Sequence, residues 1–249
     1  YFHRILARFI GLFFLIPLIF FFLSKKIKKY YLNKSYIILF LIIIQGVVGW
    51  YMVKSGLVNN ISVSHYRLSV HLIMAFLIIS TIFWLIKNII NNKNKFFFIF
   101  SIKSFLFLFL IFLIFIQIII RAFVSGLDAG KIYQTWPLMG NSYLPNDLFV
   151  INFINIFDFD NHSLVQFYHR NLAYIIILYS TVISIYIYKN KFKNLYKPLQ
   201  ILLFVILLQI LLGIFTLISG LNIFLASTHQ ITSILLVFSA LNLYYFRAK

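Results

Sequence analysis

Seven apolar segments run through the sequence, and each is long enough to cross a lipid bilayer as a helix. A helix needs ~20 mostly apolar residues to cross a hydrocarbon core of ~30 Å, and in lipid its backbone polar groups must be bonded internally. The predicted spans are residues 5–23, 36–53, 67–86, 104–124, 169–188, 198–218 and 223–246. Only 10% of the residues are charged, against ~25% in a soluble domain. The sequence therefore predicts an all-α polytopic membrane protein.

The net charge of +18 indicates how these helices are oriented. Fifteen of the 22 Lys and Arg residues lie in segments 24–34, 87–103 and 189–197 and in the C-terminal tail, whereas all four acidic residues lie in the loop 125–168. Because inner loops carry the excess of Lys and Arg, we expect the three basic segments inside and 125–168 outside. A basic chain can also bind nucleic acid, but that needs a soluble basic face, which these apolar runs exclude.

The chain contains no cysteine. Disulfides, zinc–thiolate sites, iron–sulfur clusters and thiol nucleophiles are therefore excluded. The sequence also begins without methionine, at a point where it is already entering an apolar segment, so we expect a fragment of a longer protein.

The first half of the sequence is repeated weakly in the second half. Three pairs of blocks match in the same order: residues 1–7 with 167–173, 45–57 with 209–221, and His71 with His229. The bias toward Leu, Ile and Phe is the alternative source of matches, but three in one order argue against chance. The second half has four predicted helices and the first half three, so we expect a missing helix before Tyr1. The intact protein is then two pseudo-symmetric four-helix halves, 1–103 and 104–249 in this numbering.

Four of the six histidines lie at similar depth on the predicted helices: His3, His71, His169 and His229. They lie 16 to 22 residues from the first inner-face cation of their helix, which is about 24–33 Å at the rise of an α-helix. His65 and His162 are predicted to lie in outer loops. A single histidine within a span is often a hydrogen-bonded packing residue, but a cluster of ionisable groups at one depth favours a functional site.

Two histidines per half, one on each of two helices, are suited to a metal cofactor held within a bundle. Zinc, copper and haem iron all accept imidazole. A zinc site normally adds Cys or acidic ligands, which these helices lack. The pattern therefore favours a planar macrocycle with an axial imidazole on each side, and hence two haem sites.

Three arginines lie beside these histidines in the sequence: Arg4, Arg170 and Arg67. Guanidinium binds carboxylates through two parallel hydrogen bonds, so we expect contacts to haem propionates. The alternative is that these side chains extend to lipid head groups.

Two glutamines and three glycines lie within the spans. We expect Gln45 and Gln209 to form interhelical hydrogen bonds rather than cofactor contacts. Gly46, Gly49 and Gly213 are expected to allow close approach of a helix or a flat ring.

The sequence resembles the haem A synthase family along its whole length. The matching blocks are YFHRILARFIGL, QGVVGWYMVKSGL, HYRLSVHL, RAFVSGLDAGKIYQTWPLMG, LVQFYHRNLAY and LASTHQ. The loop block from Gly126 to Gly140 is the most specific, because its polar pattern owes nothing to hydrophobic bias. The lack of loop cysteines resembles the alphaproteobacterial and mitochondrial branch.

This resemblance implies an eight-helix enzyme that oxidises the C8 methyl group of haem O to a formyl group, giving haem A for terminal oxidases. It implies that His169 and His229 hold a low-spin haem b, and that His3 and His71 hold the haem O substrate. The family carries a glutamate three residues before the first histidine, a position that falls immediately before Tyr1. Since the sequence contains no Glu, we expect truncation there, and a chain that ends there should be catalytically crippled.

The implied partners are haem O, haem O synthase, terminal oxidase assembly factors, an unidentified electron donor and a second copy of the chain. The location is a bacterial inner membrane or the mitochondrial inner membrane. Two other functions fit the histidine pairs. A di-haem b-type electron-transfer subunit usually places haems on both sides of the membrane, which four histidines at one depth disfavour. A haem carrier without chemistry does not explain the resemblance of the long outer loop.

Overall fold

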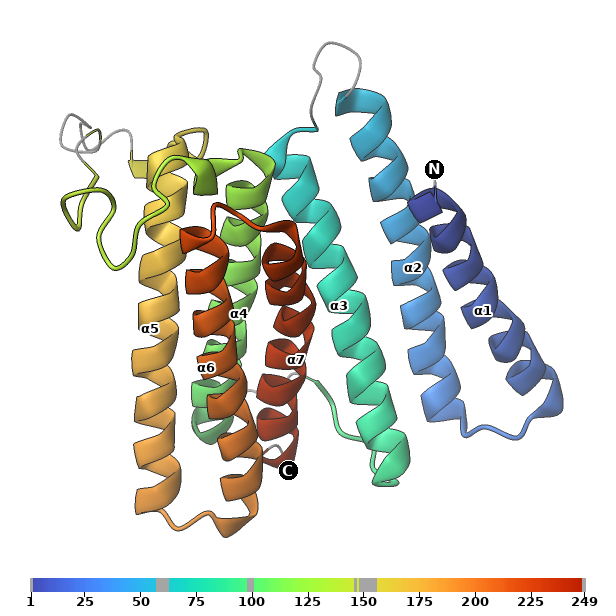
Figure 1. Ribbon diagram of the computed structural model, residues 1–249. Helices are drawn as coiled ribbons and strands as arrows, with labels where there is room; N and C mark the ends of the chain where they lie inside the picture. Colours follow the sequence, from blue (N-terminus) through green and yellow to red (C-terminus); the bar gives the residue numbers. More distant parts are fainter. Residues whose placement is uncertain (1, 57–62, 98–100, 146, 148–155, 248–249) are drawn as a thin grey trace. The chain divides into compact units, whose positions relative to one another are not determined.

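A computed structural model of the protein describes residues 2–56, 63–97, 101–145, 147 and 156–247 (Figure 1). Within these residues, seven helices are long and apolar enough to cross a membrane. They are α1 (Phe2–Ser24), α2 (Lys29–Gly56), α3 (His65–Ile90), α4 (Ile102–Gly126), α5 (His162–Lys189), α6 (Tyr196–Ile218) and α7 (Ile223–Arg247). The prediction of an all-α integral membrane protein with these seven spans is confirmed.

Several helices extend beyond their predicted spans. His65 and His162, which were expected in outer loops, are the first residues of α3 and α5, so that expectation was wrong. At the start of α5 the Asn161 side chain accepts a hydrogen bond from the Leu164 backbone N–H at 3.0 Å, which caps the helix. Hydropathy finds only the apolar centre of a span, so a polar first turn outside the hydrocarbon escapes it.

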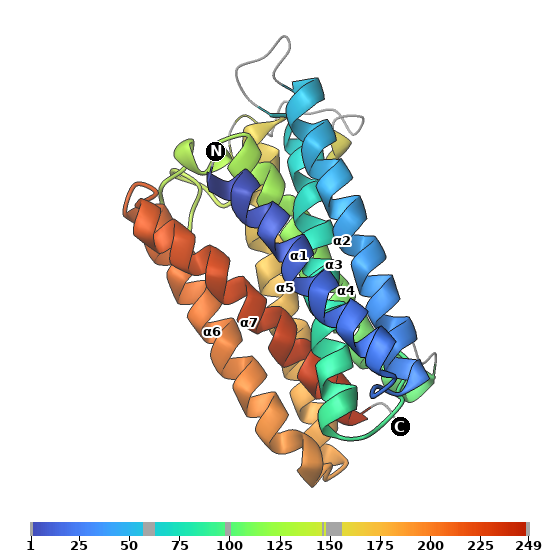
Figure 2. The ribbon, with the colours of Figure 1, turned by 90° about the vertical axis from the view of Figure 1, so that its right-hand side faces the viewer.

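The chain divides into two compact units, Tyr1–Phe98 and Ile99–Lys249. In the first unit, α2 packs against both α1 and α3. In the second unit, α4 packs against α5 and α7, and α6 packs along α7, as the two views of Figures 1 and 2 show. The roles expected for the halves 1–103 and 104–249 remain predictions.

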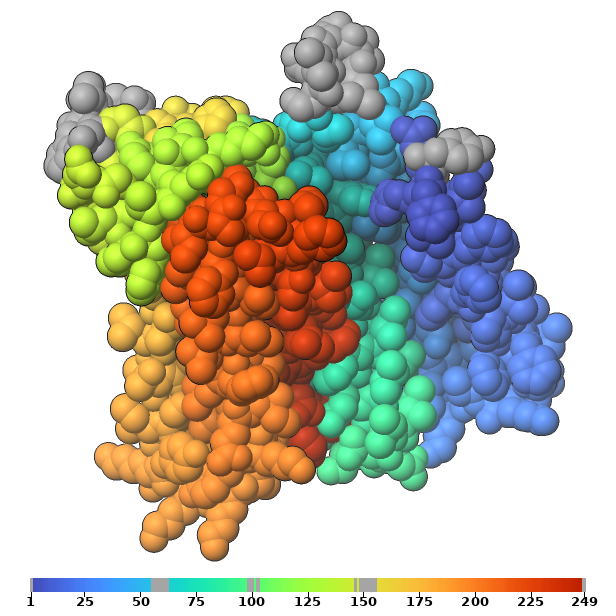
Figure 3. Space-filling model, in the orientation of Figure 1, coloured from blue at the N-terminus to red at the C-terminus, as the bar shows by residue number. Residues whose placement is uncertain are grey.

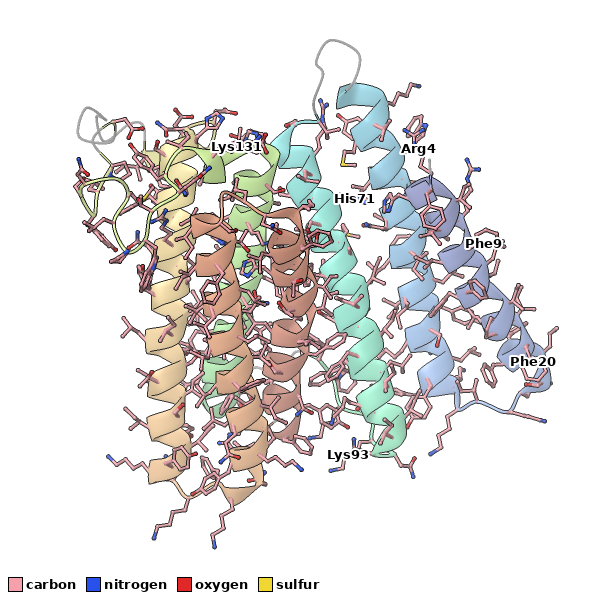
Figure 4. All side chains as sticks on the ribbon, viewed as in Figure 1. Arg4, Phe9, Phe20, His71, Lys93 and Lys131 are labelled. Carbon is pink, nitrogen blue, oxygen red and sulfur yellow. The ribbon has the colours of Figure 1, made fainter. Side chains whose placement is uncertain are left out.

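The core of the second unit is formed around α4. Phe107, Leu110 and Ile114 of this helix are almost fully buried. By contrast, α1 in the first unit exposes most of its apolar side chains, including Phe9 and Phe20 (Figure 4). An apolar surface of this size is stable when lipid or another protein segment covers it, in agreement with a membrane location.

Hydrogen bonds join α2 and α3 at one end of the first unit. The Lys95 carbonyl accepts hydrogen bonds from the side chains of Tyr30, Trp84 and Asn88 at 3.0–3.1 Å. Figure 4 shows Lys93 at this end, and Arg4 and His71 toward the other. The candidate site of this unit therefore lies away from its lysine-rich end.

The loop that follows α4 is held against the second unit. The Tyr133 carbonyl accepts hydrogen bonds from Gln166 at 2.8 Å and from Arg170 at 3.0 Å, both on α5. In Figure 3 this loop lies against the end of α6, and a Cβ on Gly130 would be 3.0 Å from Leu221 in the turn between α6 and α7. The loop thus covers the end of the unit at which His169 and His229 lie.

A tyrosine–aspartate hydrogen bond also lies in this loop. The Tyr133 hydroxyl donates to Asp147 Oδ1 at 2.9 Å. Desolvation and this hydrogen bond raise the pKa of the Tyr133 phenol above its ordinary value. The phenol therefore keeps its proton, and the contact persists, throughout the neutral pH range.

Candidate functional site

The candidate site of the first unit is built around His71 on α3 (Figure 4). A Cβ added to Gly49 of α2 would lie only 3.0 Å from Cε1 of the His71 ring. Gln45, one turn earlier on α2, donates from Nε2 to the His71 carbonyl at 3.1 Å, and this atom lies 3.3 Å from His71 Nε2. Nδ1 of His71 is buried and has no hydrogen-bond partner in the described structure. Because Gly49 has no side chain, the imidazole can lie against α2, and the Gln45 amide holds His71 there. The two contacts fix the ring between α2 and α3.

The second unit repeats this arrangement around His229 on α7. A Cβ on Gly213 of α6 would lie 3.2 Å from Cε1 of His229. Gln209 Nε2 donates to the His229 carbonyl at 3.3 Å and to Thr232 Oγ1 at 2.5 Å. Nδ1 of His229 is likewise buried and has no hydrogen-bond partner among the described residues. Two units that match weakly in sequence thus share two contacts at these histidines, the glycine beside the ring and the glutamine bonded to the histidine carbonyl.

These contacts test what the sequence predicted for the polar and small residues. Gln45 and Gln209 form interhelical hydrogen bonds, as expected. Gly49 and Gly213 allow the close approach of a flat ring, and that ring is an imidazole. At Gly46 no neighbour lies within 4 Å of the place a Cβ would take, so the close approach of a helix is not found there.

His169 on α5 is the second histidine of this unit. Its carbonyl accepts a hydrogen bond from Gln117 Nε2 of α4 at 2.9 Å, and its buried Nδ1 has no partner among the described residues. His169 lies close enough to His229 for a charge on one ring to act on the other. The two predicted histidines of this unit therefore lie within electrostatic range of each other.

His3 is the remaining predicted histidine, on the first turn of α1. Its side chain is exposed, and it interacts electrostatically with His71. The two predicted histidines of the first unit therefore lie within electrostatic range of each other. The glutamate expected before Tyr1 lies outside the described residues.

The three arginines predicted beside the histidines have different surroundings. Arg4 is exposed at the end of α1 (Figure 4). The Arg67 guanidinium lies 5.5 Å from the centre of the Tyr51 ring. Arg170 donates to the carbonyls of Leu138 and Tyr133 at 3.2 and 3.0 Å. Two donors of Arg170 are thus committed to holding the loop.

Arg121 on α4 is a site residue that the sequence analysis missed. Nη1 of its guanidinium is buried and has no hydrogen-bond partner among the described residues, and its charge acts on both His169 and His229. The sequence predicted only the three arginines beside histidines as site residues, Arg4, Arg67 and Arg170. The position of Arg121 between Ile120 and Ala122, after a long apolar run, is the signal that could have found it. A buried guanidinium nitrogen without a hydrogen-bond partner is costly, so Nη1 of Arg121 is suited to an anionic ligand.

The chemistry of these donors restricts what the site can hold. No group of three or more His, Cys, Asp or Glu side chains placed to bind a metal ion occurs in the described ranges. Two imidazoles alone do not complete the coordination of a metal ion, so its other ligands must already be bound to it when it enters the site. A metal macrocycle that carries carboxylates meets the requirement, because the imidazoles take the metal and the guanidinium takes a carboxylate. The residues therefore fit a haem.

Comparison with known proteins identifies the family of the chain. The sequence model described as cytochrome oxidase assembly protein (COX15-CtaA) matches residues 1–241. A heme A synthase of Pelagibacter ubique is 45% identical over 239 residues, covering 96% of this chain and 70% of the relative. Those of a Wolbachia of Brugia malayi and of Rickettsia prowazekii are 40% and 38% identical, covering 97% and 94% of this chain and 70% of each relative. With two histidine pairs in the fold and a match along almost its whole length, the chain belongs to the family of cytochrome oxidase assembly proteins that contains these heme A synthases.

Proposed function

We propose that the protein is an oxidoreductase that converts haem O into haem A by oxidising the C8 methyl group to a formyl group. His169 and His229 hold a haem b cofactor in the second unit, and His3 and His71 hold haem O in the first. Membership of the family supports the overall reaction. The two histidine pairs support the presence of two haem sites in one chain.

The observation that carries this proposal is the repeated support of His71 and His229. Each imidazole rests on a glycine and on a glutamine of the preceding helix. A histidine that only packs in the core does not need the room left by a glycine. A histidine that binds a metal must hold its ring at a fixed angle. The same arrangement in both units is expected if both hold the same kind of group.

The protein's own residues bind and orient the haems, while bound haem iron supplies the redox chemistry. The imidazoles of His169 and His229 would take the iron of haem b, and the guanidinium of Arg121 would bind a propionate. Arg4 and Arg67 remain candidates for the propionates of haem O. Arg170 keeps the loop after α4 over the second unit, which limits entry of water.

The orientation in the membrane and the expected partners also follow from this proposal. The basic segments 24–34, 87–103 and 189–197 face the inside by the positive-inside rule, and 125–168 faces outside. Haem O comes from a haem O synthase, and haem A passes to assembly of a terminal oxidase. Converting a methyl to a formyl group removes four electrons and adds one oxygen atom, so the reaction needs an oxidant and an oxygen source. With dioxygen as the oxidant an electron donor is required as well. A homo-oligomer is compatible with the exposed apolar surface of α1.

The direct test is to express the complete gene in a host that makes haem O but no haem A, and to extract the haems. We expect haem A to appear only when the protein is present. Bound bis-histidine haem without any haem A would overturn the proposal in favour of electron transfer or haem carriage.

The close packing around Gly49 predicts the effect of adding one methyl group at this position. Gly49→Ala places a Cβ 3.0 Å from His71 Cε1 and must displace the ring. Overpacking of this kind costs about 1–3 kcal/mol, so haem A yield should fall about tenfold while the haem b spectrum of the second unit persists. Gly46→Ala, one turn earlier on α2 where space is open, is the matched control and should leave both unchanged. Equal yields from the two variants would contradict this role of Gly49.

A further inference from the structure

The matching histidines of the two units differ in what lies against Nε2. In the first unit, Gln45 Nε2 lies 3.3 Å from Nε2 of His71. In the second unit, Gln209 instead donates to Thr232 Oγ1 at 2.5 Å, and no hydrogen bond to the His229 ring is found among the described residues. The two glutamines match in the repeat, so their different contacts need a local cause.

The local cause is one substitution between the repeats. Thr232 lies three residues after His229, and Met74 lies three residues after His71. Residues three apart share a helix face. Thr232 accepts a hydrogen bond from Gln209 of the neighbouring helix, and by the repeat Met74 takes the matching position after His71. A threonine hydroxyl is a good hydrogen-bond acceptor and a thioether is a weak one. Both glutamine amides donate to the carbonyl of their histidine. The Gln209 amide has a side-chain hydroxyl as a second acceptor, whereas the second contact of the Gln45 amide is the imidazole.

This difference matters for metal binding. An imidazole binds iron through Nε2 with its unshared electron pair while the proton is on Nδ1. In that form, the electron pair of His71 Nε2 accepts the hydrogen bond from Gln45, and this bond must break before iron can bind. The same atom of His229 carries no such competitor. His71 is thus a weaker and more easily released ligand than His229.

We propose that residues 74 and 232 decide which histidine releases its haem. Met74 leaves Gln45 in competition for His71, as suits a haem that enters as substrate and leaves as product. Thr232 holds Gln209 away from the His229 ring, as suits a cofactor that stays. Gln45, Met74 and Thr232 are positioning residues, and the inference rests on the ligand roles given to His71 and His229 in the proposed function.

The experiment measures haem release from the full-length protein into an excess of apomyoglobin. Thr232→Val removes the hydroxyl while keeping the shape of the side chain, and it should free Gln209 to compete for His229. Since one net hydrogen bond is worth about fivefold in an equilibrium constant, haem b should leave about fivefold faster. Thr232→Ser keeps the hydroxyl and should release haem at the wild-type rate.

Two further variants separate this competition from simple structural damage. Adding Gln209→Leu to Thr232→Val removes the competitor and should restore slow release of haem b. In the first unit, Met74→Thr should draw Gln45 away from His71 and slow release there about fivefold. A damaged fold gives neither the restoration nor the slower release.

The outcomes distinguish this inference from the proposed function. Wild-type release from both Thr232→Val and Met74→Thr, with normal haem spectra, would overturn the inference and leave the enzyme assignment standing. An unchanged haem spectrum in His229→Ala would overturn the ligand assignment itself, and with it the inference. Faster release in Thr232→Val that Gln209→Leu reverses supports both.

Discussion

Replacing His169 or His229 with alanine is expected to abolish the spectrum of tightly bound haem b. These are the two imidazoles that the second unit brings together, and each has a buried Nδ1 without a partner in the described structure. Loss of a supporting residue around a metal costs about 10–100-fold in affinity, so loss of a ligand itself should exceed that. Absorption spectra of the purified full-length protein, with extracted haem counted per chain, measure the effect.

His162→Ala is the matched control for His169→Ala. His162 is exposed and begins the same helix, α5, two turns before His169. Its removal should leave haem content and spectrum unchanged. If all three alanine variants keep the wild-type spectrum, the second unit does not hold haem through this pair.

The fold and the identities of the histidines could be predicted because both depend on local sequence. An apolar run of ~20 residues has only one way to cross a bilayer, so the seven spans follow from hydropathy. The repeat then places His71 beside Gln45 and Gly49, and His229 beside Gln209 and Gly213, because pairs of helices with the same spacing pack alike. The sequence predicted interhelical hydrogen bonds from the glutamines and close approach at the glycines, and the structure identifies His71 and His229 as the partners.

Other parts of the site depend on partners far away in the chain. In the sequence, Arg121 is a cation near the end of α4 with no distinguishing neighbour. Its role in the site follows from the effect of its charge on His169 and His229, which lie on two other helices. Arg170 follows a histidine in the sequence, but its hydrogen bonds go to loop carbonyls more than 30 residues earlier. The direction of a long flexible side chain is decided by acceptors that folding brings to it, and spacing along one helix does not contain that information.

Arg121→Met should change stability and haem binding in opposite directions. In the cofactor-free protein, Nη1 of Arg121 is buried without a partner, so a neutral side chain of similar length should stabilise the fold by about 1–3 kcal/mol. In the haem-bound protein, the same change removes a charge-assisted hydrogen bond to a propionate. That bond is worth about 1.5–3 kcal/mol, so haem affinity should fall about 10–100-fold. Thermal unfolding in detergent, with and without haem, measures the first effect, and haem titration measures the second.

The reduction potential of the bound haem gives an independent measure of the same charge. A guanidinium beside the cofactor favours the ferrous state, because that state carries one positive charge fewer. Arg121→Met should therefore shift the midpoint potential to a more negative value. Arg121→Lys keeps the charge but loses the planar fork of donors, so its potential should stay close to wild type while part of the affinity is lost. A cofactor-free Arg121→Met protein that is less stable than wild type, with unchanged haem affinity, would make Arg121 a packing residue. Arg121→Met gives both effects, a more stable cofactor-free protein and weaker haem binding, only if the bound cofactor neutralises the charge of Arg121.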